Sequence, residues 1–299
     1  MTLLDLITAS AQSLADAGVS FGHGTTNAQD EASWLVLWQL GLPLDTALEG
    51  EDSHAALALT SEQVAQVQAL IAQRIQSRKP AAYLTREAWL QGFSFYVDER
   101  AIVPRSLIAE LLVEGGIDYF LQASTHKVLD LCTGNGSLAV IAASVFPDVE
   151  VSASDLSDDA LAVARINVDK HGLQDRIRLL ASDGLSAPEL VAQGPFDLIL
   201  CNPPYVNHQS MVDLPPEYQA EPALALDGNR EGGRDGMDFV RSLLRHVAAH
   251  LTPQGVLVLE IGNERPFFEA AFPSLEVIWL ETSAGEDQVL LLTRETLTS

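Results

Sequence analysis

The sequence predicts a doubly wound α/β fold with an antiparallel edge, preceded by a small N-terminal helical domain. Short apolar runs alternate with amphipathic stretches from residue 127 onward, which is typical of parallel strands buried on both faces and joined by helices. The first 78 residues show helical periodicity instead. The predicted domains are a helical domain at 1–79, a β-hairpin linker at 80–104 and a large α/β domain at 105–299.

Residues 1–79 carry the pattern of a small helical bundle. Apolar residues open the chain at positions 3–7, and a second apolar stretch covers 34–40 before a glycine and a proline end it. Thr60 and Gln63 have the spacing of a capping box, and apolar residues follow at helical intervals. No catalytic constellation stands out, so we expect this domain to serve recognition or packing.

The linker and the segment that follows it have a different character. Aromatic and alternating residues between Pro80 and Pro104 predict a β-hairpin. From Arg105 a helical pattern is expected to continue to about Leu121.

Buried strands are predicted at seven apolar runs. The last two runs lie too close together for a helix between them, so they are expected to form an antiparallel pair at one edge of the sheet. The runs are 127–132, 149–154, 177–181, 196–201, 255–261, 275–280 and 288–293.

Composition places the chain among globular proteins. Of its 299 residues, 47% are hydrophobic and 19% are charged, which is too apolar for a disordered chain. The two cysteines, Cys132 and Cys201, predict no disulfide framework and a reducing cytoplasm. Neither a secretory signal nor a membrane span is expected, because no basic N-terminal segment and no apolar run of about 18 residues occurs.

The charge is strongly acidic, with 41 acidic and 17 basic residues and a formal net charge of −24. A polyanion would be repelled by much of such a surface, whereas a basic protein would be attracted to it. The acidity therefore opposes sequence-independent binding of nucleic acid. Solubility is an equally simple reason for it, so charge alone does not establish a basic partner.

The most informative motif is Asn202-Pro203-Pro204-Tyr205, which directly follows the apolar run at 196–201. Two prolines fix φ and carry no N–H, so their carbonyl oxygens and the Asn side chain are available to a ligand. Tyr205 supplies a flat face for a planar group. Such a motif can hold a planar –NH2 by its two hydrogens while the nitrogen is attacked from the far side. This chemistry is methyl transfer to an amide or an exocyclic amine, if a methyl donor site lies nearby.

A second motif begins at Asp130, after the first predicted strand, and opens a helix. Gly134, Gly136 and Ala139 fit the pattern G-x-G-x-x-G/A, in which the glycines allow a tight turn and close approach of a ligand. Nicotinamide and flavin enzymes use the same pattern, so it does not identify the ligand by itself.

Acidic residues end the next two predicted strands. Asp155 occupies the position from which a carboxylate accepts hydrogen bonds from both ribose hydroxyls of a nucleoside. Helix N-terminal charge is its alternative role, because Ser157 and two further acids follow. Asp183-Gly184 would meet an adenine amine or form a plain turn.

The two motifs together are more specific than either alone. A dinucleotide site does not account for Asn202–Tyr205, whereas a methyl donor that carries adenosine accounts for both. Ligands of open α/β sheets bind at the carboxyl ends of strands where the strand order reverses. The glycine loop and Asn202 are therefore expected to face one crevice.

Other reactive side chains have simpler expected roles. The seven histidines are scattered and predict no metal site. His23, between two glycines, is expected to cap a helix or order a loop. Cys132 and Cys201 are expected to pack as small apolar residues at adjacent strand ends, with a regulatory pair as the alternative.

These residues resemble the class I methyltransferases, which have a Rossmann-like sheet, and specifically the HemK-type protein-glutamine N5-methyltransferases. Cys132 departs from the pattern, since many methyltransferases carry a glycine there, and the turn is expected to stay intact if φ is below zero at this position. The matching segments, which spread the resemblance over nearly the whole chain, are 103–105, 130–136, Asp155, 202–205, 221–228 and 235–236.

The resemblance implies S-adenosylmethionine as the methyl donor, S-adenosylhomocysteine as the product, and no metal. It implies donor contacts from Asp130, Thr133, Gly134, Gly136, Asp155, Asp183, Gly184 and Asn202. It implies catalytic roles for Asn202, Pro203 and Tyr205, and substrate contacts from Asn202, Pro203, Pro204, Tyr205 and Glu221.

Within this family, softer motifs indicate the branch that methylates protein three of the large ribosomal subunit, a basic substrate. These motifs lie at 21–25, 82–85, 88–89 and 96–100. The release-factor branch remains an alternative, although Ser-Leu-Ile rather than Pro-Asp-Thr-Glu follows Arg105 here.

Two further alternatives belong to other classes. An adenine-N6 nucleic-acid methyltransferase would use the same motif, but the acidic surface opposes it. A non-catalytic acidic escort of a basic ribosomal protein would leave Asn202 and the glycine loop unexplained. The long, acidic connection from Tyr205 to Gly236 predicts a flap over the acceptor, with an ordinary surface insertion as the alternative.

Overall fold

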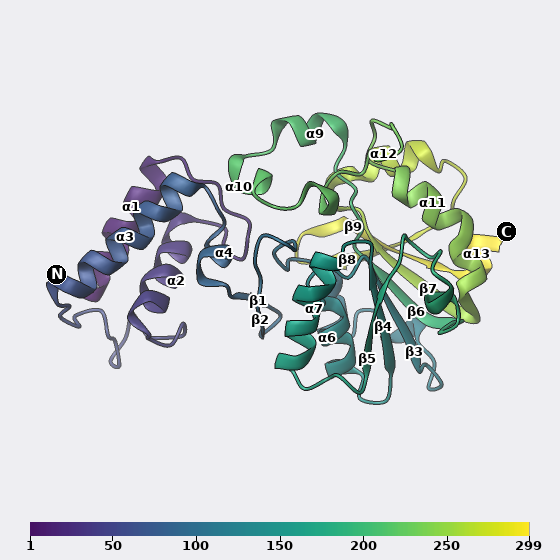
Figure 1. Cartoon of the computed structure of the whole chain (residues 1–299), viewed down its shortest axis with the longest axis horizontal. Coiled ribbons are helices and arrows are strands. Elements are labelled where there is room, and N and C mark those ends of the chain that lie inside the picture. The colour runs from purple at the N-terminus through teal and green to yellow at the C-terminus, as the bar shows by residue number, and fades with distance from the viewer. Residues whose placement is uncertain (299) are drawn as a thin grey trace. The chain divides into compact units, whose positions relative to one another are not determined.

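The chain, described over residues 1–298 by a computed structural model, consists of two compact units (Figure 1). The first, the helical unit, contains Met1–Ala88 together with the segment Leu214–Glu221. The second, the sheet unit, contains Trp89–Asp213 and the chain from Pro222 onward. Among the described residues, none of the helices combines the length and apolar character that a membrane span requires.

The helical unit contains the predicted capping box. Gln63 N donates to Thr60 Oγ1 at 3.2 Å, and Thr60 N donates to Gln63 Oε1 at 3.0 Å. A second box joins Thr2 and Asp5, which the sequence analysis did not identify. The helices whose apolar faces form one buried core are α1 (Leu3–Asp16), α2 (Ala28–Leu40), α3 (Ser61–Ser77) and α4 (Ala81–Thr85). The short helix α10 (Pro216–Gln219) belongs to the same unit and buries Glu217.

A buried ionic cluster fastens the segment 214–221 to α3 within the helical unit. The fully buried Arg74 donates to Glu31 at 2.8 Å and to Glu217 at 3.3 Å. Glu217, also fully buried, lies 2.7 Å from Arg78 Nε. An unpaired charge at such a depth is strongly unfavourable, so these ion pairs hold the segment in place.

The linker contains less β-structure than predicted. Only β1 (Ala88–Leu90) and β2 (Phe93–Phe95) form the hairpin. They flank Gln91 and Gly92, whose φ values of 49° and 79° suit a tight hairpin turn. The prediction of a hairpin over the whole of 80–104 is wrong, since α4 occupies its start and the last residues are irregular.

The predicted helix from Arg105 to Leu121 is also shorter in the structure. It consists of α5 (Ile108–Val113) and a 3₁₀ turn, η1 (Asp118–Phe120). The chain is interrupted at Gly115, which has a φ of +74°. This left-handed conformation ends a helix and favours glycine.

The predicted seven-stranded sheet is confirmed, including its antiparallel edge (Figure 1). The strand order is β5-β4-β3-β6-β7-β9-β8, and β9 runs antiparallel to both of its neighbours. The strands are β3 (Lys127–Leu131), β4 (Glu150–Asp155), β5 (Ile177–Ala181), β6 (Phe196–Cys201), β7 (Leu251–Glu260), β8 (Ile278–Thr282) and β9 (Gly285–Thr293).

Helices cover both faces of this sheet. Alternate residues of β6 enter different cores, with Leu198 and Leu200 in one and Ile199 and Cys201 in the other. The first core is closed by α5, α6 (Ser137–Val145) and α7 (Asp158–Lys170). The second is closed by α8 (Pro188–Val191), α11 (Asp238–His246), α12 (Arg265–Ala271) and α13 (Arg294–Thr298). Burial on both faces explains why these strands are apolar throughout.

The connection after β6 contains short helices. These are α9 (His208–Asp213), α10 and the 3₁₀ turn η2 (Ala223–Ala225). Two other 3₁₀ turns, η3 (Val247–His250) and η4 (Gly262–Glu264), flank β7.

Candidate functional site

The strand pairing brings the two motifs to the carboxyl ends of two neighbouring central strands, β3 and β6. In the parallel pair β3–β6, Leu131 lies opposite Cys201, so the residues that follow, Cys132 and Asn202, leave the sheet side by side. The strand β3 is paired with β4 on its other side, which makes this the point where the strand order reverses. The glycine loop and Asn202 therefore start from neighbouring strand ends, and the expectation that they face one crevice remains a prediction.

Asp130 is a buried acid at the start of the glycine loop, residues 130–139, which we also call the donor loop. Its Oδ2 accepts hydrogen bonds from the Thr133 hydroxyl and from Ala139 N, the latter at 3.0 Å. Its Oδ1 is buried and has no partner among the described residues. Burial raises the pKa of Asp130 to about 7, although both hydrogen bonds lower it. A cation placed beside Oδ1 would supply the missing partner.

The backbone at Cys132 differs from the prediction. Its φ is +63°, not negative, because the chain must turn left-handed as it leaves β3. A non-glycine residue pays roughly 1–2 kcal/mol for this conformation, which explains the glycine that many methyltransferases have here. The turn is intact, with Thr133 N donating to Ser154 O at 2.9 Å.

The two thiols pack as expected. Cys201 is fully buried in the core and Cys132 packs against that core. A hydrogen bond with Cys201, followed by burial, raises the pKa of the Cys132 thiol.

Gly134 of the loop is joined to Asp155 by a hydrogen bond. Gly134 N donates to Asp155 Oδ2 at 2.9 Å, and Ser157 N donates to Oδ1 at 2.9 Å. A Cβ on Gly136 would lie 3.1 Å from that of Ala164 on α7, so glycine permits the close helix packing. Burial raises the pKa of Asp155. These bonds hold its carboxylate at the end of β4, and its ribose contact remains a prediction.

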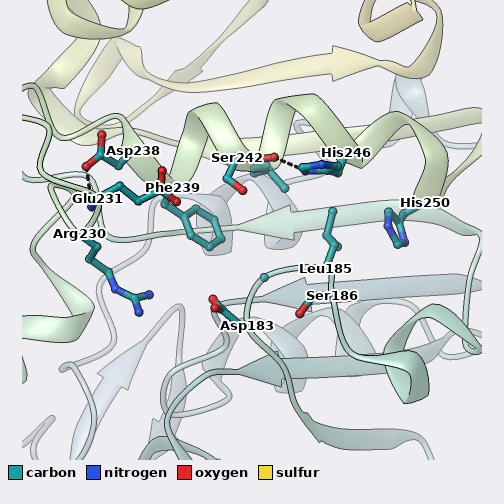
Figure 2. A pocket seen from close by; sticks show the side chains of 12 residues that line it. Asp183, Leu185, Ser186, Arg230, Glu231, Asp238, Phe239, Ser242, His246 and His250 are labelled. Carbon is teal, nitrogen blue, oxygen red and sulfur yellow. Dashed lines mark hydrogen bonds between the residues drawn. The ribbon is translucent and has the colours of Figure 1, made fainter.

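Asp183 and Gly184 line a cavity of about 550 Å³ at the end of β5 (Figure 2). Figure 2 shows Phe239 and Ser242 on α11 facing the loop that carries Asp183, Leu185 and Ser186. A Cβ on Gly184 would lie 3.8 Å from the Phe239 ring. The aromatic wall supplied by α11 was missed, because its sequence has no motif that marks it as part of a site.

The motif Asn202–Tyr205, which we call the acceptor motif, forms a turn directly after β6. Pro203 and Pro204 are buried, whereas Asn202 and Tyr205 are half-buried. Within residues 1–298, the Asn202 side chain makes no hydrogen bond, so its oxygen and nitrogen are available to a ligand. Burial, followed by the nearby Glu260 charge, raises the pKa of the Tyr205 hydroxyl.

The loop segments that resemble the family pack on this motif. Val206 N donates to Leu226 O at 2.9 Å, and Gly228 N donates to Val206 O at 3.1 Å. A Cβ on Gly236, which has a φ of +76°, would lie 2.0 Å from Tyr205 O. Only glycine allows the backbone at position 236 to lie so close to Tyr205 O. This explains why a glycine stands at position 236 of the segment 235–236 that resembles the family.

Glu221 lies in the helical unit, away from solvent. Its Oε2 is 3.3 Å from His23 Nε2, and the two side chains are 0% and 1% exposed. The ring of Tyr218 packs on His23 with a centroid distance of 4.3 Å. His23 therefore orders the segment 214–221, as expected of a loop-ordering histidine, and the substrate contact of Glu221 remains a prediction.

Glu260, an acid buried at the end of β7, was not predicted from the sequence as a residue of the site. A single acid at the end of an otherwise apolar run was the available signal.

Among the described residues, no group of three or more His, Cys, Asp or Glu side chains is arranged to bind a metal ion.

Comparisons with known proteins agree with this geometry. The profile of the family described as Methyltransferase small domain matches residues 110–217. The chain is 51% identical to the ribosomal protein uL3 glutamine methyltransferase of Bordetella pertussis, over 99% of this chain and 96% of that protein. It is 48% identical to the protein of the same name from Burkholderia pseudomallei, over 97% and 94% of the two chains.

A solved structure shares the fold. The human Mettl16 catalytic domain, in complex with MAT2A 3′UTR hairpin 1, superposes with a TM-score of 0.52 at 14% identity. The match covers 82% of this chain and 84% of that one.

The strand order and the two motifs that follow the neighbouring strands β3 and β6 define a class I methyltransferase. The chain belongs to the family of ribosomal protein uL3 glutamine methyltransferases, as its identity to these relatives over nearly the full length shows. The resemblance to the large-subunit branch of the HemK-type enzymes is confirmed.

Proposed function

We propose that this chain transfers a methyl group from S-adenosylmethionine to the N5 nitrogen of a glutamine side chain in ribosomal protein uL3. The names of its relatives support this substrate. The observation that carries the proposal is the register of β3 and β6, with Leu131 opposite Cys201. It starts the donor loop and the acceptor motif side by side, as a direct transfer between two ligands requires.

The donor site fits a cationic nucleoside. Asp130 has a buried carboxylate oxygen without a partner, which suits a positively charged ligand nearby. S-Adenosylmethionine supplies an electrophilic methyl group on a sulfonium when bound. The residues proposed to hold it are Asp130, Thr133, Gly134, Gly136, Asp155, Asp183, Gly184 and Asn202.

At the acceptor site the chain's task is to expose the nitrogen lone pair of an amide. The Asn202 side-chain oxygen and the Pro203 carbonyl accept the two amide hydrogens, which favours a pyramidal nitrogen. Pro204 keeps the turn rigid, and Tyr205 packs on the amide plane. The new N–C bond forms as the S–C bond breaks, and the acidic N-protonated product then loses its proton to water. Orientation therefore supplies much of the rate.

The remaining parts are assigned to substrate selection. We assign residues 1–79 to recognition of uL3, 80–104 to the linker, and 105–299 to the methyltransferase domain. The loop 206–235 acts as a flap over the acceptor, and the acidic surface attracts a basic ribosomal protein. The enzyme acts in the cytoplasm, where its substrate is made.

Substitution of Asn202 by Ala tests the proposal. Loss of one positioned hydrogen-bond partner is expected to lower kcat about 10²–10³-fold, while the Kd for S-adenosylmethionine changes little. The measurement is transfer of labelled methyl to purified uL3, together with calorimetric titration of the donor. Gln174→Ala, which removes an exposed amide from the turn between α7 and β5, is the control and should retain full turnover.

A release factor, incubated separately with the labelled donor, should remain unlabelled. Turnover of uL3 by Asn202→Ala at the wild-type rate would refute the assignment of the acceptor site.

A further inference from the structure

Glu260 links two segments that are far apart in the sequence. It lies at the carboxyl end of β7, next to the strand that carries the acceptor motif, and is 4% exposed. Its Oε2 accepts hydrogen bonds from Ser106 Oγ at 2.6 Å and Leu107 N at 2.9 Å. Its Oε1 accepts one from the Tyr205 hydroxyl at 3.4 Å. One carboxylate thus joins the start of α5 to the aromatic residue of the acceptor motif.

The residues after Glu260 also hold Tyr205. A Cβ on Gly262 would lie 2.7–2.9 Å from the atoms of the Tyr205 ring, so the backbone of Gly262 lies directly against the ring. Two residues further on, Glu264 accepts hydrogen bonds from Asn207 N at 3.3 Å and Asn207 Nδ2 at 2.8 Å. The segment 260–264 therefore fixes the ring, the hydroxyl and the following backbone of the motif.

The hydrogen-bond pattern favours a carboxylate at this position. Three donors converge on two oxygens, and an ionised carboxylate is acceptor-only. A glutamine would offer one acceptor oxygen, and its NH2 group would donate to the Tyr205 or Ser106 hydroxyl, so that this hydroxyl could no longer donate to position 260. Arg105 lies close enough to favour the ionised form, against the burial that raises the pKa of Glu260.

We propose that Glu260 is a positioning residue for methyl transfer, which acts through Tyr205 to hold the aromatic ring at the acceptor amide. This inference rests on the proposed function and deepens it. Glu260 itself touches no substrate. Its effect is to remove the rotational freedom that the Tyr205 ring would otherwise have at the mouth of the site.

The test uses Glu260→Gln, Tyr205→Phe and the double variant in the full-length protein. If Glu260 acts through the hydroxyl, each single variant should lower kcat about 10–100-fold. The Kd for S-adenosylmethionine should change less than about twofold. The double variant should be no slower than the worse single variant, since both remove one interaction. Glu281→Gln, which removes an exposed carboxylate on β8, is the control.

Three outcomes would overturn the inference: additive losses in the double variant, wild-type kcat in Tyr205→Phe, or equal losses of donor binding and turnover. If Glu260→Gln fails to fold, Tyr205→Phe decides alone, because it leaves the bonds to Ser106 and Leu107 intact. The Asn202→Ala variant distinguishes failure of the proposed function from failure of the role assigned to Glu260. An inactive Asn202→Ala beside a fully active Glu260→Gln refutes this inference and leaves the proposed function standing.

Discussion

Asp130 combines two properties that rarely occur together in a stable protein. Its carboxyl is completely buried, and one of its oxygens lacks a hydrogen-bond partner among the described residues. Burial raises its pKa to about 7, with a smaller contribution from the Asp155 charge. Near neutral pH the group is therefore partly protonated. A cation that binds beside it favours the ionised form and must displace the proton.

From this we predict that donor affinity depends on pH. Below about pH 7 the protonated Asp130 must release its proton on binding, so affinity should rise with pH by up to about tenfold per unit. Above about pH 7 it should level off. Calorimetric titration with S-adenosylmethionine between about pH 5.5 and 8.5 measures this dependence.

Asp130→Asn provides the control for that prediction. This substitution removes the titrating group. The affinity of the variant for S-adenosylmethionine should therefore be lower, and its dependence on pH should be weaker, with only the titration of the ligand itself remaining. Identical pH profiles for the wild type and Asp130→Asn would contradict the role assigned to this carboxyl.

The residue types of the site could be predicted from the sequence, whereas their local conformations could not. Asn202 and the glycines of the donor loop have backbone and side-chain chemistry that is readable from their identity. The sign of φ at Cys132 depends on how the chain leaves β3. Likewise, the burial of Glu221 depends on His23, which is remote in the sequence.

At the level of elements, the strands were predictable because burial on both faces makes each one a continuous apolar run. β6 shows this clearly, since its alternate residues enter two different cores. The linker was not predictable, because aromatic residues such as Tyr83 are compatible with both a helix and a strand. The segment 214–221 was also missed as part of the helical unit, since Glu217 and Glu221 look like solvated acids in the sequence.

The buried ionic cluster gives an element-scale prediction. Arg74→Met leaves two buried carboxylates, those of Glu31 and Glu217, without this partner, and burial already raises the pKa of Glu31. Breaking a buried ion pair in this way is expected to cost about 3–5 kcal/mol of unfolding free energy. Chemical denaturation measures the loss, and amide hydrogen exchange should become faster at residues 214–221.

Arg245→Met, which removes an exposed guanidinium on α11, is the matched control and should change stability little. Unchanged exchange at 214–221 in Arg74→Met would show that the ion pairs do not hold this segment.

For the whole molecule, the chain path and the charge are the relevant features. The chain passes from the sheet unit to the helical unit at Leu214 and back after Glu221, so the loop that follows the acceptor motif belongs to both units. Over all residues the formal net charge is −24. A basic substrate is attracted by this field, while a nucleic acid is repelled.

The charge predicts that recognition of uL3 weakens with salt. Raising the ionic strength from about 0.05 to 0.5 M shortens the screening length and should raise the KM for uL3 about tenfold. Both kcat and the Kd for S-adenosylmethionine should change little, because the transfer takes place between groups in direct contact. Steady-state methylation at several salt concentrations measures the dependence. A short uncharged peptide containing the target glutamine serves as the control, and its KM should not respond to salt. If the KM for the intact protein is equally insensitive, the acidic surface contributes to solubility and not to substrate capture.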